Sequence, residues 1–214
     1  MSRKTIIRNT QLSDISSIIL LQKKVYPSIP CWREEMLRHQ LEIFPQGQLV
    51  AEIDGHLVGA ASSLVISWNQ WAVQHTWKDI TAHGSFDTHN PQGLTLYGAE
   101  VFVNPTMRGS GIGHALYQGR RRLCRKFNLK RIIACGRLPG YHRYAKEMPI
   151  ELYAQKVVWG DIRDPVLSFQ LHEGFNYCGI VRDYIPEDRE SLGYASLIVW
   201  LNPHYNEKKP TLIT

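Results

Sequence analysis

Apolar residues recur along the first part of the chain at two different spacings. Helical spacing follows Ser13, where Ile15, Ile18 and Ile19 form one apolar face. Alternating residues flank the dipeptide Asp54-Gly55, which suits a two-residue hairpin turn because both positions tolerate positive φ. The pattern predicts a strand at residues 5–8, helices from Ser13 and over 32–44, and paired strands at 49–53 and 56–60.

The second part of the chain alternates strand and helix patterns. Strands are predicted at residues 95–103, 130–135, 177–185 and 194–201, and helices over 112–127 and from Asp164-Pro165 to Gly174. This order predicts one α/β domain over residues 1–205, followed by a polar tail at 206–214. We expect removal of the tail to leave thermal stability unchanged, because it is polar and terminal.

Two long stretches, 67–93 and 136–160, lack regular periodicity. The first is rich in Trp and His, and the second contains the run from Pro139 to Tyr144. Both are too long for plain connections between elements. We expect them to be insertions that wall the acceptor side of a binding site.

Composition and charge narrow the range of partners. The 214 residues carry a formal charge of +6, which favours an anionic ligand. The four cysteines show no C-x-x-C spacing, so no metal site is expected. The start lacks a signal-peptide core and no apolar run could span a bilayer, which predicts a cytoplasmic protein that binds no membrane.

A glycine-rich loop connects the strand at 95–103 to the next helix. It runs from Arg108 to Gly113 and places unpaired backbone N–H groups before a helix N-terminus, where an anion is favoured. Arg108 adds a charged donor. A dinucleotide-binding fingerprint would need Gly at position 114, where this chain has His114, so an NAD site is disfavoured. No Gly-Lys-Ser/Thr sequence is present, so a P-loop nucleotide site is disfavoured as well.

The loop, Arg-x-x-Gly-x-Gly after Val-x-Pro, resembles the acetyl-CoA signature of the GNAT superfamily of N-acetyltransferases. The order of elements over residues 3–202 and the step Glu173-Gly174-Phe175 resemble the same family. A closer similarity, at residues 75–77, 136–142, 164–170 and 193–195, is to GNAT modules fused to a carbon-nitrogen hydrolase domain.

The resemblance implies a GNAT fold, a mixed and mostly antiparallel central sheet flanked by helices. It also implies acetyl-CoA as co-substrate. The residues expected to contact it are Phe102, Val103, Arg108, Gly109, Ser110, Gly111, Ile112, Gly113, His114, Ser168 and Phe169.

Acyl transfer to a primary amine makes unequal demands on acid and base. Delivering a free amine from an ammonium of pKa ~10.4 at pH 7 costs roughly 4.6 kcal/mol, whereas a thiol of pKa around 8.5 leaves without an acid for roughly 2 kcal/mol. Strict alternation places Glu100 on one strand face with Leu96, Gly98 and Phe102, an apolar setting that raises a carboxyl pKa. Glu100 is the best candidate base; an ion-paired structural carboxylate is the alternative.

The general acid is harder to assign. GNAT enzymes commonly place a Tyr four residues before the Gly of the Gly-Phe step, but this chain has Gln170 there. Tyr184 is a candidate substitute, and Tyr141 and Tyr194 are others. His142 is a secondary candidate as base or substrate contact. Backbone N–H groups around Phe102 and Val103 are expected to face the thioester oxygen.

These features predict transfer of an acetyl group to a small-molecule or peptide amine by direct attack in a ternary complex. The sequence does not identify which amine is the acceptor. A homodimer is compatible with the sequence. The alternative is a non-catalytic CoA-binding module or a partner of a separate hydrolase. A nucleic-acid binder using the basic run from Arg120 to Lys126 is the weaker rival, because aromatic and basic residues are not interleaved.

Overall fold

The computed structural model describes residues 4–27, 29–72, 74–211 and 213. Its centre is a seven-stranded sheet in the order β1-β2-β3-β4-β5-β7-β6. Among the strands of the described residues, β4 and β5 pair in parallel and every other neighbouring pair is antiparallel. The strands are β1 (Ile6–Asn9), β2 (Gln48–Ile53), β3 (His56–Ile66), β4 (Thr95–Val103), β5 (Arg131–Arg137), β6 (Asn176–Val181) and β7 (Ala195–Leu201).

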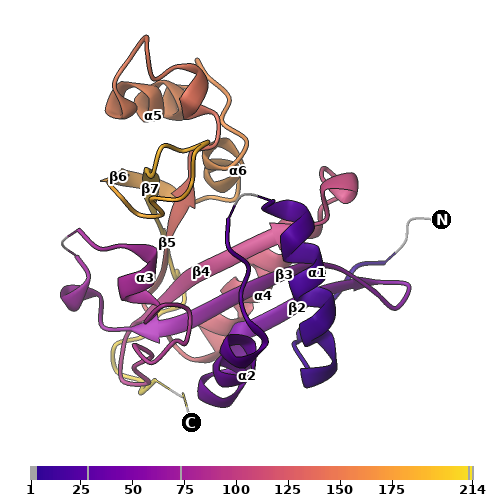
Figure 1. Ribbon diagram of the computed structural model, residues 1–214. Helices are drawn as coiled ribbons and strands as arrows, with labels where there is room; N and C mark the ends of the chain where they lie inside the picture. Colours follow the sequence, from indigo (N-terminus) through magenta and orange to yellow (C-terminus); the bar gives the residue numbers. More distant parts are fainter. Residues whose placement is uncertain (1–3, 28, 73, 212, 214) are drawn as a thin grey trace.

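Helices cover both faces of this sheet (Figure 1). The helices are α1 (Ile15–Val25), α2 (Glu34–Ile43), α3 (Trp77–Ile80), α4 (Ile112–Lys126), α5 (Ile150–Trp159) and α6 (Leu167–His172). α1 and α2 cross the front of the sheet in Figure 1 and α4 lies behind it, while α5 and α6 sit at the end formed by β6 and β7. The expected mixed, mostly antiparallel sheet flanked by helices is confirmed.

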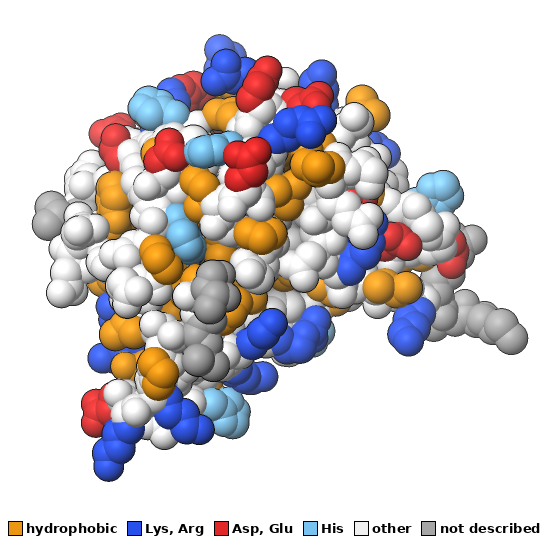
Figure 2. Space-filling view, turned by 90° about the horizontal axis from the view of Figure 1, so that it is seen from below, with side chains coloured by type: hydrophobic (Ala, Val, Ile, Leu, Met, Phe, Trp, Pro, Cys, Tyr) orange, Lys and Arg blue, Asp and Glu red, His pale blue; other side chains and the backbone are white. Residues whose placement is uncertain are grey.

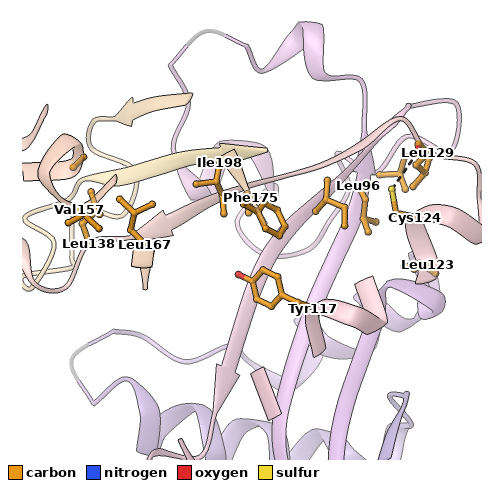
Figure 3. Close-up of a cluster of buried hydrophobic side chains, with 14 of the residues drawn as sticks. Leu96, Tyr117, Leu123, Cys124, Leu129, Leu138, Val157, Leu167, Phe175 and Ile198 are labelled. Atoms are coloured by element: carbon orange, nitrogen blue, oxygen red, sulfur yellow. Dashed lines mark hydrogen bonds between the residues drawn. The ribbon is translucent and has the colours of Figure 1, made fainter. Parts of the chain in front are cut away.

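Apolar packing on the α4 face connects this helix to the end of the sheet. Tyr117 of α4 packs edge-on against Phe169 and Phe175, with ring centroids 5.3 and 5.4 Å apart. Figure 3 shows Tyr117 with its hydroxyl directed away from Leu123 and Cys124 of the same helix. The Tyr117 ring is therefore part of a buried apolar cluster, while its hydroxyl can form a hydrogen bond with residues of other elements.

The predicted strands and helices are present with shifted boundaries, but the two stretches expected to be irregular also contain helices, α3 in the first and the ten-residue α5 in the second. Asp54 and Gly55 have φ values of 50° and 78°, so the hairpin turn uses the positive φ expected of this dipeptide. β3 continues to Ile66 because its later residues are also buried. The helix expected from Asp164 begins later, because α6 starts at Leu167 with Val166 as its N-cap, although Oδ1 of Asp164 accepts the N–H groups of Val166 and Leu167, both at 2.9 Å.

The first irregular stretch contributes to the core as well as to the surface. Ile80 and Phe86 have no measurable exposure, and His75 is 6% exposed. The His75 ring lies edge-on to Tyr97 and Tyr184, with centroids 6.3 and 6.1 Å away. The crowding of Trp and His in 67–93 is thus explained in part by packing.

The polar segment after Asn202 is anchored. Asn128 donates from Nδ2 to the carbonyl oxygens of Asn206 and Lys209, both at 2.8 Å, and its Oδ1 accepts the N–H of Asn206 at 2.9 Å. These contacts give a reason to expect a cost on truncation, contrary to the expectation from composition alone.

The basic run on α4 is not a continuous surface stripe. Arg120 and Arg121 are 2% and 6% exposed, and Arg121 pairs with Glu173 at 3.2 Å. Figure 2 shows basic, acidic and hydrophobic side chains interspersed on the face seen from below. Within the described residues, none of the helices combines the length and apolar character that a membrane span requires.

Candidate active site

The sheet splits between β4 and β5. Parallel pairing joins Thr95 to Arg131 and ends where Gly98 meets Ala134. Beyond that point β5 continues to Arg137 with β7 as its partner, while β4 continues with β3 alone. The two strands therefore diverge, and the edges that face each other carry no strand-to-strand ladder.

A bulge in β4 lies at the point of this split. Ser63 pairs with Gly98 and Ser62 with Glu100, so Ala99 is an extra residue on β4. The bulge breaks the alternation assumed from sequence. Gly98 faces Arg120 of α4, whereas Glu100 faces Tyr26 at the end of α1. The prediction that Glu100 shares a face with Leu96 and Gly98 was therefore wrong.

Side chains replace the missing strand partner at the bulge. Trp77 donates from Nε1 to the carbonyl oxygen of Ala99 at 3.0 Å. Arg120 donates from Nη2 to the carbonyl oxygens of Glu100 and of Ser62, the latter at 2.9 Å. These bonds satisfy backbone acceptors that the split leaves open, and they hold the bulge in one conformation.

A cleft of about 1320 Å³ occupies the split. It brings together the three candidate catalytic residues Glu100, His142 and Tyr184. Of the residues expected to contact the cofactor, those that line it are Phe102, Val103, Arg108, Gly109, Ile112, Gly113 and Phe169. Both irregular stretches contribute lining residues, including Trp77 and Arg143.

The other expected cofactor contacts are engaged elsewhere. The Ser110 hydroxyl donates to the carbonyl oxygen of Met107 at 2.6 Å. Nδ1 of His114 lies 2.9 Å from a Glu173 carboxylate oxygen. The Ser168 hydroxyl accepts the N–H of Asp164 at 3.0 Å. Gly111 has no side chain and is the residue that precedes α4.

The glycine loop has a backbone that few other residues could adopt. Gly109 and Gly111 have φ values of 80° and 82°, in the left-handed region. Gly113 allows α6 to approach, since a Cβ there would lie 3.0 Å from Cζ of Phe169. The N-terminus of α4 therefore opens toward the cleft with its first N–H groups unpaired within the helix, which favours an anion.

Glu100 combines partial burial with an open path to the cleft. Its Oε1 accepts hydrogen bonds from the Tyr26 hydroxyl at 3.1 Å and from the N–H of Val101 at 2.9 Å. Burial raises the pKa of the Glu100 carboxyl to about 7, against the lowering effects of these bonds and of Arg137 and Arg120. A carboxyl with this pKa can both hold and release a proton near neutral pH.

His142 and Tyr184 offer different chemistry. Nδ1 of His142 lies 2.9 Å from the carbonyl oxygen of Pro139. Since a carbonyl only accepts, Nδ1 carries the proton, and Nε2 of the neutral ring is left as an acceptor. The Tyr184 hydroxyl lies 2.6 Å from that of Tyr97, and burial raises the pKa of Tyr184 well above its ordinary value. Tyr184 therefore remains protonated.

Gln170 occupies a tight, buried position beside β5. Its Nε2 donates to the Tyr117 hydroxyl at 3.2 Å, and a Cβ on Gly136 would lie 2.2 Å from its Oε1. Oε1 is buried and has no hydrogen-bond partner in the described part of the chain. Tyr141 and Tyr194, the other tyrosines considered as acids, pack against each other with ring centroids 5.7 Å apart, and neither lines the cleft.

Sequence reasoning missed two residues beside Glu100. Tyr26 follows α1, and Arg137 ends β5; the Arg137 guanidinium lies 5.2 Å from the centre of the Tyr26 ring. Arg137 also pairs with Asp188 at 2.5 Å and with Glu190 at 2.9 Å. Tyr26 has no local sequence signal, and the resemblance over 136–142 gives Arg137 no role, because both residues reach Glu100 through contacts distant in sequence.

Comparison with known proteins assigns the chain to a family. The model of the acetyltransferase (GNAT) family matches residues 15–148, so the chain belongs to the GNAT family. It is 46% identical over 203 residues to the probable hydrolase YhcX of Bacillus subtilis, covering 95% of this chain but only 40% of that protein. It is 36% identical to the uncharacterized N-acetyltransferase YkwB of the same organism, covering 94% of this chain and 90% of YkwB.

Solved structures share the fold at lower identity. The GNAT-like decarboxylase GphF in complex with isobutyryl-CoA has a TM-score of 0.78 at 23% identity, covering 92% of this chain and 99% of GphF. A phosphinothricin acetyltransferase from Sinorhizobium meliloti in complex with AcCoA has a TM-score of 0.57 at 18% identity, covering 99% and 95%. Both of these proteins are described with a bound acyl-CoA.

Proposed function

We propose that this chain transfers an acyl group, acetyl in the simplest case, from acyl-CoA to a primary amine. The observation that carries the proposal is the placement of Glu100, with its pKa near 7, in the same cleft as the glycine loop before α4. The loop offers backbone N–H groups and Arg108 to the pyrophosphate, and the thioester would lie along the split toward the bulge. Family membership supports an acyl-CoA as donor.

The chemical step follows from this arrangement. The neutral amine attacks the thioester carbon, the C–S bond breaks, and CoA leaves as a thiolate. Glu100 accepts the proton that the amine loses, directly or through one water, since its carboxylate is near the bulge where the carbonyl would lie. Backbone N–H groups of Phe102 or Val103 would donate to the carbonyl oxygen as its charge grows.

The cofactor assignment is tested by binding, with a matched control. Gly111→Val forces a β-branched residue into φ 82° at the loop, while Gly160→Val imposes the same strain at φ 86° after α5, away from the cleft lining. By calorimetry, acetyl-CoA affinity should fall at least tenfold for Gly111→Val only. Equal affinities would refute the loop as the pyrophosphate site.

Turnover is tested with acetyl-CoA and a library of amines that includes polyamines, amino acids and peptide N-termini, with release of free CoA as the readout. Acylated product from at least one amine class is expected. Binding of acetyl-CoA without turnover of any amine would favour the alternative, a CoA-binding module that is not itself catalytic.

A second candidate is decarboxylation of a carboxylated acyl-CoA. It is motivated by the likeness to GphF and by the lining residues Arg143 and Arg163, exposed cations that have no ion-pair partner within the described residues. In this reaction the C–C bond to the carboxylate breaks, CO₂ leaves, and the resulting carbanion takes a proton. Conversion of malonyl-CoA to acetyl-CoA, followed by mass spectrometry, separates this candidate from amine acylation.

A further inference from the structure

Arg120 is a buried cation whose partners are all neutral. Its side chain is 2% exposed. Nε donates to the Ser63 hydroxyl at 3.1 Å, and Nη2 donates to the two backbone carbonyls at the bulge. Across the described ranges, no carboxylate lies within ion-pair distance of it. Burying a guanidinium without a carboxylate is unfavourable, so stability alone does not account for it.

The remaining nitrogen of Arg120 is free at the apex of the split. Nη1 makes no hydrogen bond to any residue that the structure describes, and Arg120 lines the cleft. A Cβ on Gly98 would lie 3.2 Å from Nη1. Because Gly98 is the last β4 residue paired with β5, Nη1 lies where the two strands part.

Among the described residues, the side chains packed beside Arg120 on α4 and α6, Tyr117 and Gln170, are poor proton donors for a leaving group. Gln170 fills the space beside Gly136 on β5 and bonds the Tyr117 hydroxyl. The Arg120 guanidinium lies 5.6 Å from the centre of the Tyr117 ring. Burial raises the pKa of Tyr117, and an amide does not give up a proton. A group leaving at this place would meet a fixed positive charge instead of an acid.

We infer that Arg120 stabilises the departing CoA thiolate through its Nη1–H, so that electrostatic stabilisation replaces a general acid. This rests on the proposed function, because it requires the thioester to lie in the split. When the C–S bond breaks, the electron pair stays on sulfur, Arg120 keeps its proton, and the thiolate is protonated later by water. The donors left free are both on one nitrogen, Nη1, and can be directed at one sulfur atom, whereas a carboxylate bound by two parallel bonds needs donors on two nitrogens and Nη2 is already occupied.

The test measures the ionisation of the CoA thiol while it is bound, which needs neither an acceptor amine nor turnover. The ultraviolet absorbance of the thiolate is titrated in the protein–CoA complex, with the complex of desulfo-CoA as the blank for the protein's own tyrosines and thiols. A free thiol has a pKa around 8.5, and the bound thiol should titrate at least one unit lower. Affinity for CoA, but not for desulfo-CoA, should accordingly rise with pH.

Variants locate the effect on one side chain. Arg120→Gln should return the titration of the bound thiol to the free value or above, and Arg120→Lys should keep part of the shift because it keeps the charge. Arg125→Gln is the matched control, since Arg125 lies on the same helix but is exposed and stacks 5.6 Å from the Trp200 ring centre. Circular dichroism checks that each variant is folded, and the comparison of CoA with desulfo-CoA requires no variant.

Three results would overturn the inference, and they can be told apart. If the protein binds CoA but the bound thiol titrates as free CoA does, Arg120 has no such role while the proposed function stands. If neither CoA nor acetyl-CoA binds, the proposed function fails with it. If malonyl-CoA binds much more tightly than acetyl-CoA, and Arg120→Gln removes that preference, Arg120 receives a carboxylate instead.

Discussion

At the scale of single residues, the chemistry of this cleft depends on Glu100 being neither fully solvated nor ion-paired. Its carboxylate accepts two hydrogen bonds and lies near two arginines that pair elsewhere or with neutral groups. The balance leaves its pKa at about 7. A base must be deprotonated to act, so the rate should rise with pH through this value.

Replacing Glu100 tests that role directly. Glu100→Gln should bind acetyl-CoA normally and lose roughly 10²- to 10⁴-fold in kcat, the usual range for a general base. The loss should shrink toward high pH, because solution then supplies the neutral amine as pH approaches ~10.4. A kcat loss that is the same at every pH would instead indicate a structural carboxylate.

Tyr26 should adjust the base without taking part in the reaction. Its hydroxyl hydrogen bond lowers the Glu100 pKa, so Tyr26→Phe should move the rising limb of the kcat profile to higher pH. One hydrogen bond contributes about 1 kcal/mol, which corresponds to less than one pH unit. An unchanged limb with a uniformly lower kcat would show that Tyr26 only supports packing.

At the scale of elements, most strands and helices can be predicted from the sequence because each has its own periodicity, whereas α5 lies in a stretch where no regular periodicity was recognised. The hairpin at Asp54-Gly55 and the loop before α4 also carry local signals in their glycines. The bulge at Ala99 has no such signal, since it arises from the mismatch between β4 and its two neighbours. For the same reason the side of the sheet on which the Glu100 side chain lies was predicted incorrectly. The contacts of Tyr26 and Arg120 at the bulge were not predicted either.

The junction between β5 and α6 offers a test of packing at this scale. Gly136→Ala would place a Cβ 2.2 Å from Oε1 of Gln170, so the amide must move. The free energy of unfolding should fall by about 1–3 kcal/mol. The double variant Gly136→Ala/Gln170→Ala removes the clashing atoms and should cost less than the sum of the two single changes. Strict additivity in urea denaturation would contradict the contact.

At the scale of the whole molecule, the polar end of the described chain contacts the turn after α4, although its polar composition alone predicts no such contact. Asn128 has φ 52°, a left-handed conformation that Asn tolerates. Its side chain bonds Asn206 and Lys209. The segment therefore closes over the C-terminal end of α4, opposite the glycine loop.

Deleting residues 206–214 should lower stability without affecting the cleft. The three hydrogen bonds with Asn128 contribute about 1 kcal/mol each, and a loss of about 2–3 kcal/mol lowers Tm by roughly 4–12 °C in a chain of this size. Acetyl-CoA affinity should not change, because none of the described residues of this segment lines the cleft.

Asn128→Gly provides the control, since glycine keeps the positive φ and removes the side-chain bonds. It should lower Tm by a similar amount, and truncation in the Asn128→Gly background should add little, because both changes remove the same contacts. If truncation leaves Tm unchanged while Asn128→Gly lowers it, the stabilising bonds lie elsewhere in the turn and the segment only rests on it.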